Sequence, residues 1–79
     1  MVSDKIRALL KLKGKEYIEL ATHLGIRRQA LHNKLHRDTY TAVDLIKIAE
    51  FFNVELAFID DKIKIPLDIS DIKEKTEES

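Results

Sequence analysis

The sequence predicts a mainly α-helical protein, with a compact body of four helices over residues 1–53, a β-hairpin over residues 54–69 and a charged tail over residues 70–79. Apolar residues recur every three or four positions up to Asn53, which is the period of an amphipathic helix. After Asn53 they alternate with other residues at a period of two, as in a half-buried strand. A chain of 79 residues holds a single domain with a modest core.

The only two glycines separate the first three expected helices. We expect Ser3 to cap the first helix and Gly14 to end it, because serine accepts hydrogen bonds from the first turn and glycine tolerates a left-handed conformation. The second helix runs from about Glu16 to His23 and ends at Gly25. The side chains expected on the buried faces of these two helices are Ile6, Leu9, Leu10, Ile18, Leu20, Ala21 and Leu24.

Two further helices complete the expected body. The third runs from about Arg27 to His36. Thr41 followed by Asp44 three residues later is the pattern of a capping box, which predicts that the fourth helix begins here; it ends near Asn53. The apolar residues of the two helices are Leu31 and Leu35 in the third and Val43, Leu45, Ile46, Ile48, Ala49, Phe51 and Phe52 in the fourth.

Alternating apolar residues on both sides of Asp60 and Asp61 predict the hairpin. Pro66 cannot donate to a strand ladder and is expected on an edge or at a strand end. A lone hairpin is unstable unless its apolar face is covered, either by the chain's own fourth helix or by a second copy across a two-fold axis. In the second case, the homodimer interface consists of Val54, Leu56, Phe58, Ile63, Ile65 and Leu67. From Ser70 onward we expect a frayed tail or one short helical turn.

The net charge is zero, but positive and negative residues are unevenly distributed along the chain. Residues 1–37 carry nine Lys or Arg and three acidic residues, whereas residues 38–79 carry five Lys and eleven acidic residues, so the two parts have net charges of +6 and −6. This asymmetry indicates that the first part faces a polyanion and the second faces something else. With no apolar run near the roughly 18 residues of a membrane span and no secretory signal, we expect a cytoplasmic protein with no membrane partner.

The segment Tyr17–His36 (YIELATHLGIRRQALHNKLH) carries the functional signal. Two helices joined by a turn as short as residues 25–27 must cross steeply, and their apolar residues converge on the core. The opposite side of the third helix carries Arg28, Gln29, His32, Asn33 and His36. Arginine can bind guanine, and glutamine or asparagine can bind adenine, through two hydrogen bonds in the major groove. This face therefore suits the reading of base edges.

Over residues 4–53 the sequence resembles the helix-turn-helix domain of the lambda-repressor/Cro superfamily, often called XRE-type. The similarity lies in the spacing of Ala21 and Gly25, in the stretch DLIKIAEFFNVEL and in the apolar residues Leu20, Leu24, Ile26 and Leu31. The resemblance implies a compact helical body that places its third helix in the major groove, usually as a homodimer on a two-fold operator. It assigns base contacts to Arg28, Gln29, His32 and Asn33.

Three positions depart from the family pattern. Tyr17 stands where family members often have glutamine, whose amide holds a phosphate, and a tyrosine hydroxyl can make the same contact. Lys34 stands where the family usually has an apolar residue, and we expect Leu35 to replace it in the core, which implies a slightly rotated recognition helix. Arg27 stands where a Ser or Thr cap is common, so the third helix begins without a good side-chain cap. The resemblance implies phosphate contacts from Tyr17 and from Arg37, Thr39 and Tyr40 after the third helix, and we expect the basic residues Lys15 and Arg27 to add to them.

We therefore expect a transcriptional regulator, most simply a repressor, that binds a specific double-stranded operator as a homodimer. The alternative is an antitoxin or protein-interaction module whose acidic second half binds a basic partner. The sequence lacks a Gly-rich phosphate loop, a nucleophile elbow and cysteine, so we expect no catalysis and no cofactor. His32 and His36 have the spacing of a zinc-binding pair, but Asn33 replaces the glutamate of a metalloprotease and no third ligand lies nearby. We expect no metal site.

Overall fold

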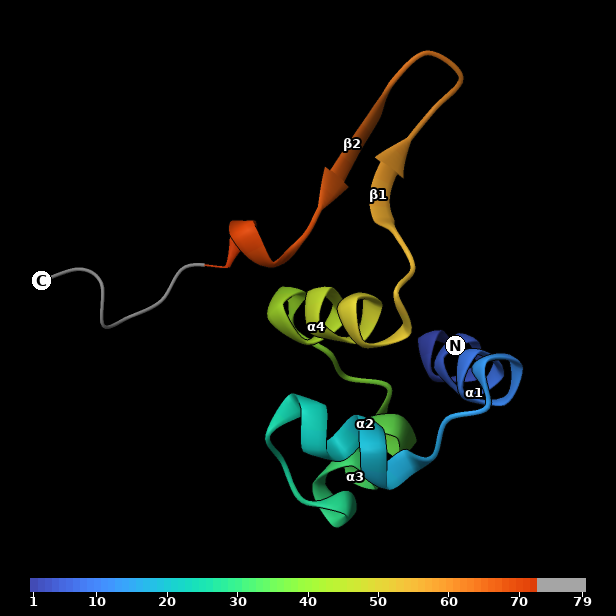
Figure 1. Ribbon diagram of the computed structural model, residues 1–79, viewed down its shortest axis with the longest axis vertical. Helices are drawn as coiled ribbons and strands as arrows, with labels where there is room; N and C mark the ends of the chain where they lie inside the picture. The colour runs from blue at the N-terminus through green and yellow to red at the C-terminus, as the bar shows by residue number, and fades with distance from the viewer. Residues whose placement is uncertain (73–79) are drawn as a thin grey trace, which may run out of the picture.

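A computed structural model describes residues 1–72 of the chain. Over this range the elements are α1 (Val2–Lys13), α2 (Tyr17–Leu24), α3 (Arg28–Arg37), α4 (Ala42–Phe52), β1 (Leu56–Ile59), β2 (Lys64–Leu67) and a 3-10 turn, η1 (Ile69–Asp71). Figure 1 shows α1–α4 gathered into a helical body, from which the β1–β2 hairpin projects at the end away from α3. The predicted fold, mainly helical with a C-terminal hairpin, is confirmed. The predicted tail begins with the helical turn η1, and its residues 73–79 lie outside the described range.

The core of the helical body consists largely of the predicted apolar faces. The buried cluster comprises Ile6, Leu10, Leu20, Ala21, Leu31, Leu35, Ile48 and Phe52. Ile18 was expected in this cluster, and that prediction is wrong, because half of Ile18 is exposed. The inward stripe of α2 is Tyr17, Leu20, Ala21 and Leu24, at the spacing of one helix face, and Ile18 lies beside that stripe. None of the helices in the described part of the chain combines the length and apolar character that a membrane span requires.

The ends of the helices follow local signals. Gly14 and Gly25 end α1 and α2 in the left-handed conformation, as predicted. Asp38 and Asn53 end α3 and α4 in the same way, with φ of 57° and 56°. Aspartate and asparagine are the residues other than glycine that adopt this conformation most readily.

The predicted capping box at the start of α4 is confirmed. The Thr41 hydroxyl accepts a hydrogen bond from the Asp44 backbone N–H, and the Asp44 carboxylate accepts one from the Thr41 backbone N–H, each at 3.0 Å. Both donors would lack a partner within the helix, so the box stabilises the start of α4.

Ser3 does not cap α1, contrary to the prediction. The helix begins at Val2, with Met1 at the N-cap position, and Ser3 lies fully buried in the first turn. The backbone N–H of Ser3 donates to Asp38 Oδ1 at 2.7 Å, so the carboxylate that satisfies this turn comes from the end of α3. Sequence spacing could not reveal a capping acceptor 35 residues away.

The Ser3 hydroxyl forms hydrogen bonds with three groups around the end of α3. Its Oγ lies 2.7 Å from the Leu35 carbonyl oxygen and 2.9 Å from Asp38 Oδ1, and it also contacts the Tyr40 hydroxyl. The Leu35 and Asp38 oxygens can only accept, so the single Ser3 proton is shared between them and Tyr40 donates to Ser3. The backbone N–H and the hydroxyl of Ser3 hold the pKa of Asp38 below its usual range.

Within residues 1–72, the hairpin packs against the helical body through its base. Its register pairs Leu56 with Leu67 and Phe58 with Ile65, and Pro66 lies in β2 opposite Ala57. Val54, Leu56 and Leu67 are half-buried near α4. The other residues of the predicted dimer interface, Phe58, Ile63 and Ile65, are exposed. The chain's own α4 thus covers the near end of the apolar face and leaves the far end open.

Candidate nucleic-acid interface

The predicted base-reading residues lie together on the exposed face of α3. Arg28, Gln29, His32 and Asn33 are all exposed, and Leu31 and Leu35, on the opposite face, are buried in the core. Gln29 Nε2 donates to Asn33 Oδ1 at 3.4 Å, which places these two amides side by side one turn apart. The face therefore presents a guanidinium, an imidazole and paired amides to solvent.

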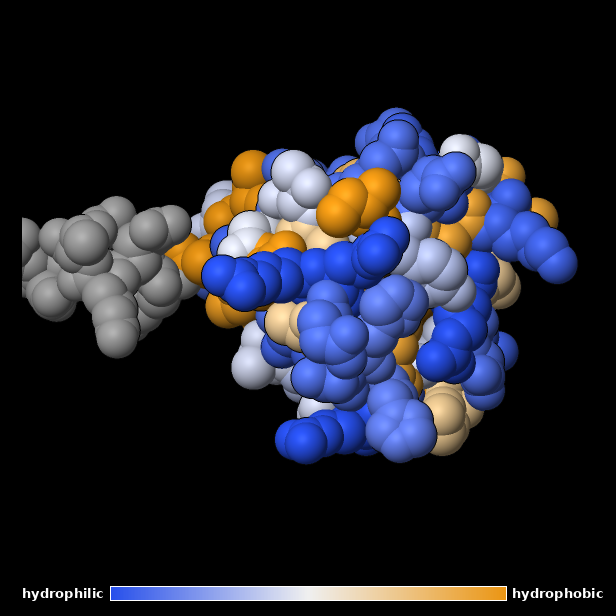
Figure 2. Space-filling model, turned by 90° about the horizontal axis from the view of Figure 1, so that it is seen from below, coloured by the Kyte–Doolittle hydropathy of each residue, from blue (hydrophilic) through white to orange (hydrophobic). Residues whose placement is uncertain are grey.

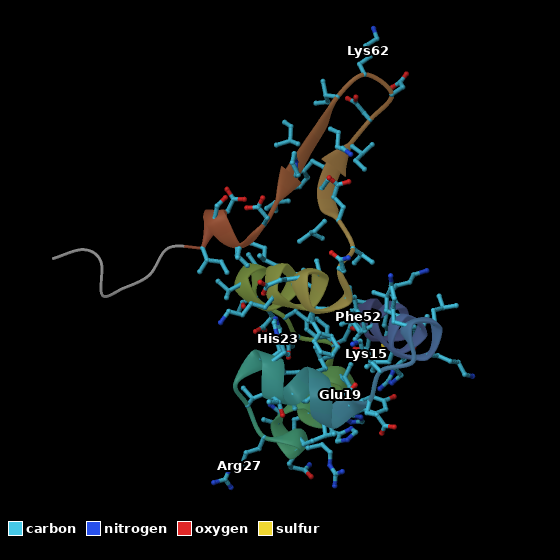
Figure 3. All side chains as sticks on the ribbon, in the orientation of Figure 1. Lys15, Glu19, His23, Arg27, Phe52 and Lys62 are labelled. Atoms are coloured by element: carbon cyan, nitrogen blue, oxygen red, sulfur yellow. The ribbon has the colours of Figure 1, made fainter. Side chains whose placement is uncertain are left out.

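This face belongs to the hydrophilic end of the molecule. Figure 2 shows the helical body from the end opposite the hairpin, and most of the visible surface is hydrophilic. In Figure 3, Arg27 projects from the start of α3 at this end, whereas Lys62 marks the tip of the hairpin at the other. The hairpin leaves the α3 end open to a large partner.

Leu35, and not Lys34, occupies the core face of α3, as predicted. Leu35 is 1% exposed. Lys34 instead forms a 2.9 Å ion pair with Asp44 of α4. Partial burial of Asp44 opposes ionisation, but the hydrogen bonds from Lys34 and from the Thr41 backbone N–H outweigh it and lower the pKa of Asp44. Lys34 therefore links α3 to α4.

The start of α3 carries positive charge. Arg27 occupies the N-cap with an extended backbone, and its side chain makes no capping hydrogen bond, as predicted. The first N–H groups of a helix point outward and concentrate partial positive charge. Arg27 and Arg28, both exposed, add two formal charges at the same place. This end of α3 is suited to an anion such as a backbone phosphate.

A row of basic residues extends this surface onto α1. The Tyr17 ring lies 5.1 Å from the His32 ring, and Lys15 Nζ lies 5.5 Å from the Phe51 ring centroid. Next to Lys15 and Tyr17 is an open groove of about 460 Å³. The residues that line it include Asp4, Arg7, Ala8, Leu10, Lys11, Lys15 and Tyr17. Sequence reasoning did not single out Arg7 and Lys11. Their spacing of four residues, which continues to Lys15, was the signal that could have identified them.

The remaining predicted phosphate contacts divide into two groups. Arg37 and Thr39 are exposed near the end of α3. Tyr40 packs against the core, and its hydroxyl contacts Ser3, so it positions the loop that follows α3.

No protein-family model, curated protein or solved structure matches the chain.

Proposed function

We propose that the protein is a cytoplasmic transcriptional regulator that binds a specific double-stranded DNA sequence as a homodimer and represses by occupying a two-fold operator. The observation that supports this function is the exposed polar face of α3, which carries Arg28, Gln29, His32 and Asn33 at the open end of the molecule. An α-helix fits the major groove, and these side chains have the donors and acceptors that distinguish base pairs there.

In this proposal the two kinds of contact have separate tasks. Arg28 and Gln29, in the first turn of α3, contact base edges together with His32 and Asn33. Lys15, Tyr17, Arg27 and Arg37 contact phosphates, and Arg7 and Lys11 add positive charge along the same side. Phosphate contacts fix the position of the helix in the groove, and base contacts give the preference for one sequence.

The distribution of charge supports the same orientation. Acidic residues are concentrated in the second part of the chain, and those of the hairpin, Glu55, Asp60 and Asp61, lie in the element that projects away from α3. The hairpin also carries two lysines and so offers DNA no net positive charge, whereas the basic residues near α3 favour an approach of DNA from that side.

Selection from random duplex oligonucleotides with the purified protein tests the function. We expect enrichment of a two-fold symmetric site whose halves lie about one DNA turn, roughly 34 Å, apart. The Arg28→Ala variant should bind the selected site about 1–3 kcal/mol more weakly and lose preference at one base pair of each half-site. Selection of no common sequence by the wild-type protein contradicts the function. An unchanged preference in Arg28→Ala contradicts the assignment of that residue.

A further inference from the structure

The far end of the hairpin is an apolar surface that no described residue of the same chain covers. Phe58 and Ile59 expose 67% and 68% of their surface, and Ile63 and Ile65 expose 52% and 55%. Phe58 and Ile65 are opposite each other in the register, so their side chains share one face of the hairpin. Large apolar side chains clustered in this way mark a site of interaction rather than an ordinary surface.

An apolar groove that could receive such side chains lies at the base of the same hairpin. A groove of about 230 Å³ runs between α4 and the hairpin, and its walls include Ala42, Leu45 and Ile46 of α4 and Leu56, Phe58 and Leu67 of the hairpin. A cavity of about 150 Å³ accommodates benzene, so the groove has room for an aromatic or branched aliphatic side chain. Phe58 thus lies both on the wall of the groove and at the start of the exposed apolar surface.

We propose that the groove receives Phe58 and Ile65, the exposed hairpin residues next to it, from a second copy of the chain, so that each copy fills the groove of the other. This inference rests on the proposed homodimer and assigns its interface. Because the inserting residues and the receiving groove are adjacent on one molecule, a two-fold axis beside Phe58 forms both contacts at once, which is the self-complementary arrangement of an isologous dimer.

The size and charge of the surface favour a second copy over a basic protein partner. The exposed apolar side chains on this face, Phe58, Ile63 and Ile65, present on the order of 300 Å², somewhat under half of the roughly 800 Å² that each partner buries in a standard interface, and the groove walls add to it. Residues 54–67 carry three acidic residues and two lysines, and Lys64 is paired with Glu55 at 2.9 Å. This nearly balanced charge offers little attraction to a basic partner and little repulsion between copies.

The position of the hairpin agrees with a dimer that binds DNA. The hairpin projects from the end of the helical body away from α3 (Figure 1). Two copies that pack their hairpins side by side, with the two-fold axis along the hairpins, direct both α3 helices toward the same side. A dimer so arranged can insert both helices into one face of a duplex.

Sedimentation equilibrium of the full chain tests the interface. We expect a dimer for the wild-type protein and an increase in the dimer dissociation constant of about 30-fold or more for Phe58→Asp, the change that removal of an interface hot spot causes. Leu12→Asp is the matched control, because Leu12 is 81% exposed on α1, outside both the hairpin and the groove, and it should leave the dimer unchanged. Circular dichroism verifies that each variant is folded.

A second variant tests the groove separately. Ala42→Glu places a carboxylate at the first residue of α4, where negative charge favours the helix, so this variant should fold. Its charge on the groove wall should weaken the dimer as Phe58→Asp does. Normal dimerisation of Ala42→Glu overturns the proposal, and so does a monomeric wild-type chain at the highest concentration reached. Binding of an isolated half-site by α3 distinguishes failure of this interface from failure of DNA binding.

Discussion

At the scale of single residues, Ser3 connects the start of the chain with the end of α3. It is fully buried, and its hydrogen-bonding groups reach Leu35, Asp38 and Tyr40. Ser3→Ala removes the hydroxyl and leaves the partly buried Tyr40 hydroxyl without its partner there, so we expect the free energy of unfolding to fall by about 1–3 kcal/mol. Urea denaturation measures this change. Ser70→Ala, at an exposed serine in η1, is the control and should change stability little.

The pH dependence of the same variant identifies the role of Asp38. The Ser3 backbone N–H and hydroxyl lower the pKa of Asp38 in the folded state, so the ionised carboxylate stabilises the fold above its unfolded pKa of 3.8. That contribution is lost as the pH falls through the lower, folded value. The stability difference between the wild-type protein and Ser3→Ala should therefore shrink in acid. A difference that stays constant from pH 6 to below pH 3 would show that the hydroxyl acts independently of the Asp38 charge.

At the scale of elements, the two ends of α3 are built differently. Its last turn is joined to α1 through Leu35 and Asp38, whereas its first turn has Arg27 at the N-cap with no side-chain cap. Arg27→Ser supplies a hydroxyl that accepts from the first turn, so we expect a gain in stability of about 1 kcal/mol. The same change removes a cation from the proposed phosphate surface, so DNA affinity should fall alike for all sequences.

Arg27→Ala separates these two effects. Alanine removes the cation without supplying a cap, so DNA affinity should fall as far as in Arg27→Ser while stability stays near that of the wild-type protein. Thermal denaturation and titration with random duplex DNA provide the two measurements. Equal DNA affinity in the wild-type protein and both variants would exclude Arg27 from the phosphate contacts.

The elements that could be predicted from sequence are those that depend on local signals. The apolar period, the glycines and the Thr41–Asp44 box locate the helices, because each acts within a few residues. The role of Ser3 depends on Asp38, which the fold brings next to it from 35 residues away, so sequence reasoning assigned it a cap instead. Ile18 was misplaced because a short apolar helix leaves the edges of its buried stripe undefined by sequence alone.

At the scale of the whole molecule, the exposed face of α3 could be predicted from the sequence more fully than the position of the basic row or of the hairpin beside it. The exposure of Arg28, Gln29, His32 and Asn33 follows from the burial of Leu31 and Leu35 on the same helix, which the period fixes. The basic row of Arg7, Lys11 and Lys15 crosses from α1 to the loop before α2, and its position beside Tyr17 depends on how the two helices pack. The hairpin's projection away from the body depends likewise on packing against α4.

The molecule as a whole has no net charge, so any strong salt dependence of DNA binding must come from the local arrangement of its basic residues. Each phosphate contact contributes about 0.9 to the slope of log affinity against log salt concentration. In a homodimer, Lys15→Ala or Arg37→Ala removes two contacts, and the slope should become shallower by about 1.8. The measurement is a salt titration with the selected operator and with random DNA. The affinity for the two should fall by the same factor in each variant.

Lys62→Ala is the matched control for this titration. It removes one lysine per chain, as Lys15→Ala does, but Lys62 lies at the tip of the hairpin, away from α3 (Figure 3). The change in net charge is therefore the same while the local field at α3 differs, and the slope should remain that of the wild-type protein. If all three variants shift the slope equally, attraction depends on total charge, and the basic surface around α3 has no special part in binding. A shift confined to Lys15→Ala and Arg37→Ala places the phosphates on the α3 side.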